Sequence, residues 1–108
     1  MAVIYSVLKE ELERLLALRA RATAERAALP HGSVVIKTKS GRRYAYLAHR
    51  EGHRVVTDYV GPEASPHALQ LAATLNKRRK ITAEIKAVDV DIADLRRMLH
   101  LQKVTNVR

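Results

Sequence analysis

The glycines and prolines of this chain all fall in one central segment, and this distribution constrains the fold more than any other feature. Residues 2–29 contain neither residue type and are rich in Leu, Ala, Glu and Arg, which are strong helix formers. The same absence holds after residue 66. Between the two stretches, Val, Ile, Thr and Tyr become frequent, as is typical of strands. We therefore expect a helix over residues 2–29, a sheet over residues 33–60 and a second helix over residues 66–101.

The central segment predicts three antiparallel strands. Ser40-Gly41 and Glu51-Gly52 each lie between extended runs, and each dipeptide predicts a hairpin with a two-residue turn. The expected strands cover residues 33–39, 42–50 and 53–60. With these turns, Lys37 lies opposite Tyr44, and Tyr44 lies opposite Tyr59.

The second long helix begins with a cap and carries an apolar seam. Ser65 is the expected N-cap, with Pro66 in the first helical position. Steps of four and three residues, which are typical of a coiled coil, join Ile81, Ile85, Val88, Ile92, Leu95 and Leu99. We predict one α+β domain over residues 1–108 of order α-β-β-β-α, with the helices as an antiparallel coiled-coil hairpin flanking the β-meander and a frayed tail over residues 102–108.

Apolar residues outside this seam indicate a further partner. Val90, Met98 and Leu101 lie on the second helix but away from the seam. A two-helix hairpin buries only one side of each helix, so these side chains need another surface. The sequence therefore predicts a homodimer with a four-helix core.

Composition narrows the class of protein. The 108 residues are 47% hydrophobic, which excludes a disordered chain, and carry a net charge of +9. The chain has no cysteine, so it has no disulfide framework, thiolate metal site or cysteine nucleophile, and this fits the reducing cytosol. No apolar run approaches the roughly 20 residues of a membrane span, and charges at Lys9-Glu10-Glu11 argue against a signal peptide. We expect a cytoplasmic protein.

One face of the predicted sheet combines tyrosines with cations. Its candidate nucleic-acid-binding residues are Lys37, Lys39, Arg42, Tyr44, Tyr46, Arg50 and Tyr59. Lys and Arg neutralise phosphates and release counterions, and Tyr stacks on bases or donates to phosphate. The alternative is a cross-strand aromatic cluster that packs against a helix or a second subunit, with the cations as a solvated rim. The opposite face has an aliphatic centre and is expected to pack on the helices.

The densest charge run lies on the second helix, at Lys77, Arg78, Arg79 and Lys80. Four successive helical residues point around most of the circumference, so they cannot all contact one surface. A solvated helix face is therefore the first interpretation. The second interpretation is contact with a phosphate backbone, which would add non-specific affinity, or with anionic lipid or an acidic partner.

The sequence offers little chemistry for catalysis. His49 and His53 point to opposite faces of the predicted sheet, so they cannot chelate one ion. Asp89, Asp91 and Asp94 do not converge on one side of their helix. No Ser–His–Asp pattern, glycine-rich phosphate loop or HExxH motif is present. We predict a protein that is not an enzyme and uses no metal or cofactor.

Several short motifs follow one another through the sheet segment: Gly32-Ser33-Val34-Val35, Gly41-Arg42-Arg43-Tyr44-Ala45-Tyr46-Leu47, Arg50-Glu51-Gly52 and Tyr59-Val60-Gly61. In order and spacing the chain resembles a group of small uncharacterised bacterial and archaeal proteins with a helix, such a sheet and a second helix. The sheet also resembles the three-stranded DNA-binding domains of transposases and integrases. The group of small proteins has three consecutive tyrosines in the second of these motifs, and here Ala45 stands in place of the middle one. The resemblance implies this fold and DNA binding, and implies no activity.

These observations favour a non-enzymatic, basic, nucleic-acid-binding protein, with DNA as the expected polymer. The alternative is a structural or protein–protein interaction module, in which the helices recruit an unknown protein partner and the basic surface is incidental. Peripheral binding to anionic membranes ranks last, because the chain has no Trp or Phe to anchor in the interface.

Overall fold

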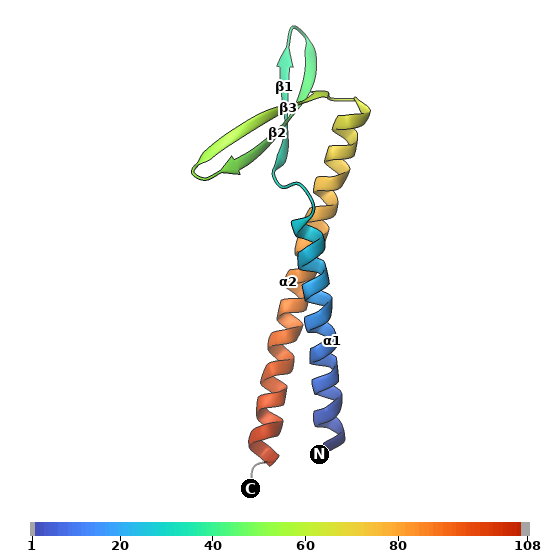
Figure 1. Ribbon diagram of the computed structural model, residues 1–108, viewed down its shortest axis with the longest axis vertical. Coiled ribbons are helices and arrows are strands. Elements are labelled where there is room, and N and C mark those ends of the chain that lie inside the picture. Colours follow the sequence, from blue (N-terminus) through green and yellow to red (C-terminus); the bar gives the residue numbers. More distant parts are fainter. Residues whose placement is uncertain (1, 107–108) are drawn as a thin grey trace. The chain divides into compact units, whose positions relative to one another are not determined.

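The computed structural model describes residues 2–106 and confirms the predicted order of elements. Helix α1 (Ala2–Ala27) precedes strands β1 (Ser33–Lys39), β2 (Arg42–Glu51) and β3 (Arg54–Pro62), and helix α2 (Pro66–Asn106) follows (Figure 1). The chain packs as two compact units. Residues 1–27 and 81–108 form the helical unit, and residues 28–80 form the sheet unit. The expectation of a single domain over residues 1–108 stays a prediction.

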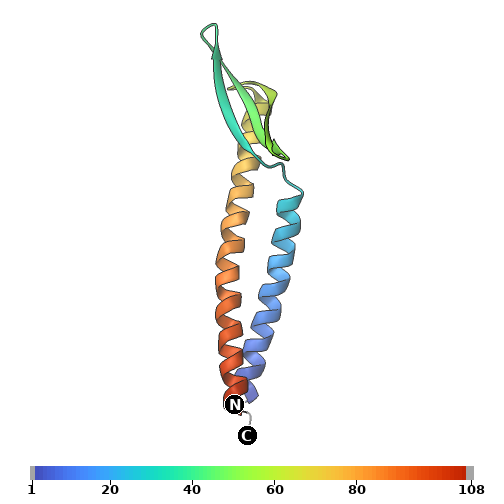
Figure 2. The ribbon, with the colours of Figure 1, turned by 90° about the vertical axis from the view of Figure 1, so that its left-hand side faces the viewer.

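In the helical unit, α1 and the later part of α2 lie side by side and run antiparallel (Figures 1 and 2). Leu15 of α1 packs with Ile92 and Leu95 of α2, and these side chains form the buried cluster of this unit. Leu8, Leu12 and Val88 pack against the cluster. The apolar seam expected on α2 is thus the face that the unit buries.

Both helix ends differ slightly from the predicted boundaries. α1 ends at Ala27 rather than residue 29. α2 continues to Asn106, past the predicted end at residue 101, because no glycine or proline interrupts it and Lys103 lies favourably in its last turn. Residues 107 and 108 of the expected tail lie outside the described residues.

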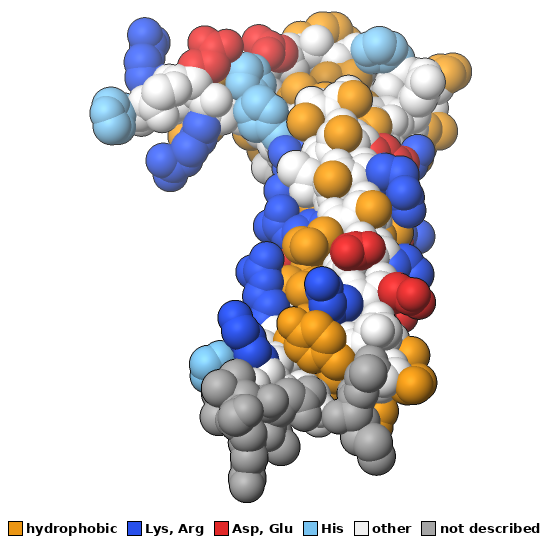
Figure 3. Space-filling view, turned by 60° about the horizontal axis from the view of Figure 1, so that its bottom comes forward, with side chains coloured by type: hydrophobic (Ala, Val, Ile, Leu, Met, Phe, Trp, Pro, Cys, Tyr) orange, Lys and Arg blue, Asp and Glu red, His pale blue; other side chains and the backbone are white. Residues whose placement is uncertain are grey.

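The surface of the helical unit mixes apolar and charged side chains. In the space-filling view, hydrophobic side chains reach the surface among acidic and basic ones along the helices (Figure 3). An ion pair between the Arg19 guanidinium and the Asp89 carboxylate links the two helices. This pair lowers the pKa of Asp89, mainly through the hydrogen bond from Arg19.

In the sheet unit, the first hairpin has the predicted register. Lys39 pairs with Arg42, and Lys37 lies opposite Tyr44. Ser40 and Gly41 both have positive φ, at 53° and 75°, which is the backbone of a type I′ turn. A type I′ turn twists the chain in the sense that the flanking strands need.

The predicted register of the second hairpin is wrong by two residues. The structure pairs Glu51 with Arg54, so the turn residues are Gly52 and His53. Only Gly52 has positive φ (64°) in this turn, which matches a type II′ turn with glycine in its first central position. Tyr59 therefore lies opposite Tyr46 instead of Tyr44. The shift is even, so every side chain up to Tyr59 keeps its predicted face.

A β-bulge follows and leads the chain toward α2. Between the pairs Tyr46–Tyr59 and Ala45–Gly61, β3 carries Val60 as an extra residue. Ala45 is only 1% exposed. The first turns of α2 lie beside the sheet in both ribbon views (Figures 1 and 2).

The start of α2 is capped as predicted. Ser65 Oγ accepts a hydrogen bond from the backbone N–H of Ala68 at 3.2 Å. Pro66 is the first residue of the helix. The cap is packed tightly, because a Cβ added to Gly61 would come within 2.9 Å of Ser65 Oγ.

Gly32 is the position where a methyl group is least tolerated. Its φ is 125°, and an added Cβ would lie 2.3 Å from the carbonyl oxygen of Ala48, whereas a Cβ at Gly41 would meet nothing within 4 Å. We expect Gly41→Ala to lower the free energy of unfolding by about 1 kcal/mol, from left-handed backbone strain alone. Gly32→Ala should lower it by about 3 kcal/mol or more, because backbone atoms must also move. Urea denaturation followed by circular dichroism measures both, and equal losses would contradict this packing.

The Arg19–Asp89 pair predicts a specific loss of stability in acid. The pKa of Asp89 lies below 3.8, its ordinary value, in the folded state. As the pH falls below about 5, the unfolded chain takes up this proton first, so the free energy of unfolding decreases until the pH passes the folded pKa. Asp89→Asn should remove this part of the acid dependence. The control variant Asp91→Asn, at an exposed neighbouring position, should retain it. The comparison needs urea denaturation between pH 2 and pH 6, and equal acid slopes for all three proteins would overturn it.

Candidate nucleic-acid interface

Strand alternation gathers a fully cationic set of charged residues on one face of the sheet. Lys37, Lys39, Arg42 and Arg50 share this face with the three sheet tyrosines, and we call it the tyrosine face. The acidic residues of the strands, Glu51 and Asp58, point to the opposite face. The tyrosine face therefore carries four Lys or Arg side chains and no carboxylate from the strands.

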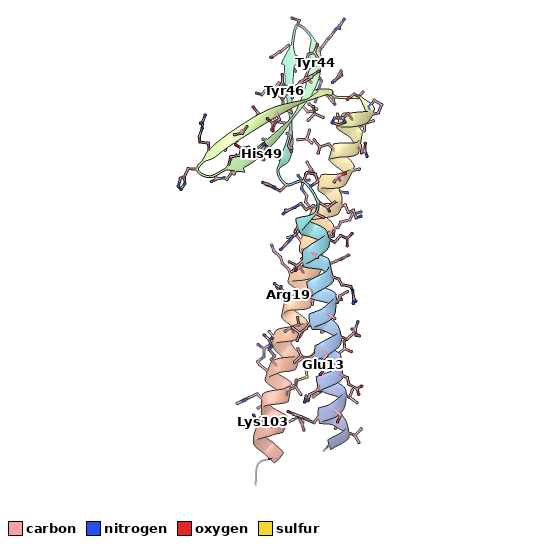
Figure 4. The ribbon with its side chains drawn as sticks, viewed as in Figure 1. Glu13, Arg19, Tyr44, Tyr46, His49 and Lys103 are labelled. Atoms are coloured by element: carbon pink, nitrogen blue, oxygen red, sulfur yellow. The ribbon has the colours of Figure 1, made fainter. Side chains whose placement is uncertain are left out.

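The tyrosines form one cluster across two strands. The Tyr46 and Tyr59 ring centroids are 5.5 Å apart with the rings at 67°, and those of Tyr44 and Tyr59 are 6.2 Å apart at 52°. These are tilted and edge-to-face contacts, which stabilise aromatic pairs beyond their burial. Tyr44 and Tyr46 are half-buried, while Tyr59 is 59% exposed. Tyr44 and Tyr46 lie along β2 in Figure 4.

Two lysines converge on one ring of this cluster. The Lys37 Nζ lies 4.6 Å from the centroid of the Tyr46 ring, and the Lys39 Nζ lies 6.0 Å from the same centroid. The electron-rich ring face attracts each ammonium group. Both ammonium groups are thereby held beside one phenol although they repel each other.

The other two cations of the tyrosine face, Arg42 and Arg50, lie toward opposite ends of β2. Arg42 lies directly opposite Lys39 in the register of the first hairpin. Pairing with β3 begins at Tyr44, so this end of the hairpin is two-stranded. Arg50 is four residues from Tyr46, which places it about 13 Å along the strand toward the second turn. The first hairpin is therefore the denser part of the predicted interface.

The charge run of α2 lies on a different element. Lys77, Arg79 and Lys80 are exposed, and Arg78 is half-buried, as expected for four successive residues that wrap around a helix.

On the opposite face, the structure brings together side chains between which the sequence predicts no contact. His49 Nε2 lies 2.7 Å from Asp58 Oδ2, and the His49 ring meets the His31 ring edge-on with centroids 6.0 Å apart. The predicted register of the second hairpin does not give this contact, which depends on the observed register, in which Asp58 is diagonal to His49. Recognising Gly52 as the first residue of a type II′ turn would have revealed it.

The same register places Arg43 near the end of β3. Its guanidinium pairs with the Glu63 carboxylate, and its carbonyl oxygen accepts a 3.1 Å hydrogen bond from the Glu63 N–H. Arg43 thus ties β2 to the connection before α2. It lies outside the tyrosine face and already has a carboxylate partner.

Neither a metal-binding cluster nor a membrane-spanning helix occurs among residues 2–106. Across these residues, no group of three or more His, Cys, Asp or Glu side chains is placed to hold a metal ion. Within the same part of the chain, no helix combines the length and apolar character needed to cross a membrane.

Comparison with known proteins places the chain in a family. Residues 5–70 match the model of DUF6788, a domain of unknown function. The match covers α1, the sheet and the start of α2, so the chain belongs to this family. No curated protein and no solved structure matches the chain.

Proposed function

We propose that this protein binds nucleic acid through the tyrosine face without catalysing a reaction, and that DNA is its polymer. The observation that supports this most directly is the placement of charge. Lys37 and Lys39 gather around Tyr46, Arg42 is adjacent, and the acidic residues of the strands lie on the other face. A surface with one sign of charge attracts a polyanion and releases its counterions.

The proposed roles follow from position. Lys37, Lys39, Arg42 and Arg50 contact phosphates, and the half-buried tyrosines give the surface a fixed shape. The charge run on α2, from Lys77 to Lys80, adds affinity that does not depend on sequence. Protein–DNA affinity of this kind falls steeply with salt.

Removing a cation from the tyrosine face should weaken binding more than removing one elsewhere. We expect Arg42→Ala to reduce affinity for a fluorescein-labelled 20-base-pair DNA about threefold to tenfold at 50 mM salt, and to lower the dependence of log affinity on log salt by about one unit. Lys86→Ala, an exposed cation of the helical unit, is the matched control and should change affinity less than twofold. Fluorescence anisotropy at 50 and 200 mM salt measures both.

The proposal fails if the wild-type protein binds neither duplex nor single-stranded oligonucleotides at 50 mM salt. It also fails if the two variants weaken binding equally. Circular dichroism shows whether each variant keeps the fold.

We further propose that the helices of the helical unit pack as a coiled coil and that a second copy of this chain completes a four-helix core. Val90 and Leu101 of α2 are 61% and 63% exposed, and Met98 is 48% exposed. Met98 also lines a shallow groove of about 300 Å³ between α1 and α2. Glu11, Arg14 and Asp94 line the same groove, so it carries both signs of charge. A two-fold related copy of such a surface brings opposite charges together.

The same exposed face supports the alternative function, a protein–protein interaction module. The two functions do not exclude each other, because this face belongs to the helical unit and the tyrosine face to the sheet unit. In the alternative, the helices recruit a different protein and the cations of the sheet are incidental. A dimer formed through the helices favours the second copy as the occupant.

Sedimentation velocity tests the dimer. At 10 µM we expect a dimer for the wild-type protein and a monomer for Met98→Glu, because burial of a carboxylate with the exposed apolar side chains Val90 and Leu101 is strongly disfavoured. Leu69→Glu changes an exposed leucine of the sheet unit and should leave the dimer intact. A stable monomer of the wild-type protein at this concentration would overturn the proposal.

A further inference from the structure

The three tyrosines of the proposed interface are already engaged with one another. Tyr59 meets Tyr46 edge-on, with ring centroids 5.5 Å apart, and meets Tyr44 at 6.2 Å. A base that intercalated between two of these rings would have to separate them. Separation would cost the aromatic contacts that hold the cluster together.

Lysine side chains also occupy the surroundings of the Tyr46 ring. The Lys37 Nζ lies over this ring at 4.6 Å from its centroid, close to the distance that a stacked base would require. The Lys39 Nζ approaches the same ring at 6.0 Å. A base can stack on this face of Tyr46 only by displacing Lys37. The half-buried state of Tyr44 and Tyr46 limits their ring surface further.

The cations are the groups left available to a ligand. Ammonium groups held over an aromatic ring still direct N–H donors outward, and Arg42 adds a planar fork of donors at the same end of the hairpin. Holding Lys37 and Lys39 at the ring lowers the side-chain entropy that they lose on meeting a phosphate. The surface is therefore built to meet phosphates, with the rings as support for the lysines.

Such a surface discriminates between double and single strands. A duplex presents its phosphates at twice the linear density of one strand, and each phosphate neutralised releases more counterion, about 0.9 against 0.7. Single strands gain much of their affinity from bases stacked on open aromatic rings. Here Tyr44 and Tyr46 are half-buried, and the more exposed Tyr59 ring is in contact with both. Lysines held at the Tyr46 ring, beside tyrosines that contact one another, thus favour binding of the duplex over the single strand.

We propose that the tyrosine face binds the phosphate backbone of double-stranded nucleic acid in preference to single strands, and that Tyr46 supports Lys37 and Lys39 instead of stacking on bases. This inference rests on the proposed nucleic-acid binding. It specifies the class of polymer and the role of the rings.

The experiment measures fluorescence anisotropy with the full chain and two probes, a labelled 20-base-pair DNA and its labelled strand of unstructured sequence. At 50 mM salt we expect the duplex to bind about tenfold more tightly or better, with a steeper fall in affinity toward 200 mM salt. Tyr46→Phe keeps the aromatic face beneath Lys37 and should bind as the wild-type protein does. Tyr46→Leu removes that face and should weaken duplex binding about twofold to fivefold.

Tyr59→Ala separates support from stacking, because Tyr59 has the most exposed of the three rings. If Tyr59 does not stack, this variant should change affinity for either probe less than twofold. A stacking role predicts a loss of at least about fivefold with the single strand. Circular dichroism and the Tyr46→Phe variant confirm that changes in binding do not come from unfolding.

The outcomes separate this inference from the function on which it rests. Equal or tighter binding of the single strand, or a fivefold loss for Tyr59→Ala, overturns the inference and leaves nucleic-acid binding in place. Absence of binding to both probes at 50 mM salt overturns the proposed function and this inference together. Duplex preference with little effect of Tyr59→Ala supports both.

Discussion

Left-handed backbone at two hairpin turns decides which side chains meet on the sheet. Ser40 and Gly41 close the first turn, and Gly52 opens the second. Side chains alternate along a strand, so a turn moved by one residue would transfer a whole strand to the other face. In β3 such a slip would place Asp58 among the lysines and remove Tyr59 from the cluster. The charge character of the tyrosine face therefore depends on a few φ angles.

The register of each hairpin could be predicted from the sequence only where the position of its turn was predicted correctly. Ser40-Gly41 forms the two-residue turn that the sequence predicts, so the register of the first hairpin, with Lys37 opposite Tyr44, is confirmed. The turn predicted at Glu51-Gly52 is wrong, because glycine is also preferred at the first central position of a type II′ turn, and the turn residues are Gly52 and His53. The faces were still predicted, since the error was two residues. The Val60 bulge and the contact of His49 with Asp58 could not be predicted, because they depend on that register and on the packing around it.

The helices were predictable for a different reason. Spacing of three and four residues identifies a buried stripe without any knowledge of the partner, and Ile85, Ile92 and Leu95 are buried in the structure. The cap at Ser65 was also readable, because its chemistry is local. The end of α2 at Asn106 could not be predicted, since no glycine or proline follows the last apolar residues of the helix. Pattern alone likewise does not identify what covers Val90 and Leu101, because exposure in one chain says nothing of the chemistry of a partner.

The segregation of carboxylates from the tyrosine face has a kinetic consequence. Charges of one sign on one side of a thin sheet produce a field that differs between its two sides, so an approaching polyanion is turned before any contact forms. Under the proposed nucleic-acid binding, encounters that begin on the tyrosine side would be productive more often than random collisions. The association rate constant of such binding, and not only its equilibrium constant, would then depend on ionic strength, because the field reaches only about 10 Å at 0.1 M salt. Under the same proposal, Gly52 and the turn that it opens would influence the association rate without any contact between this glycine and the nucleic acid.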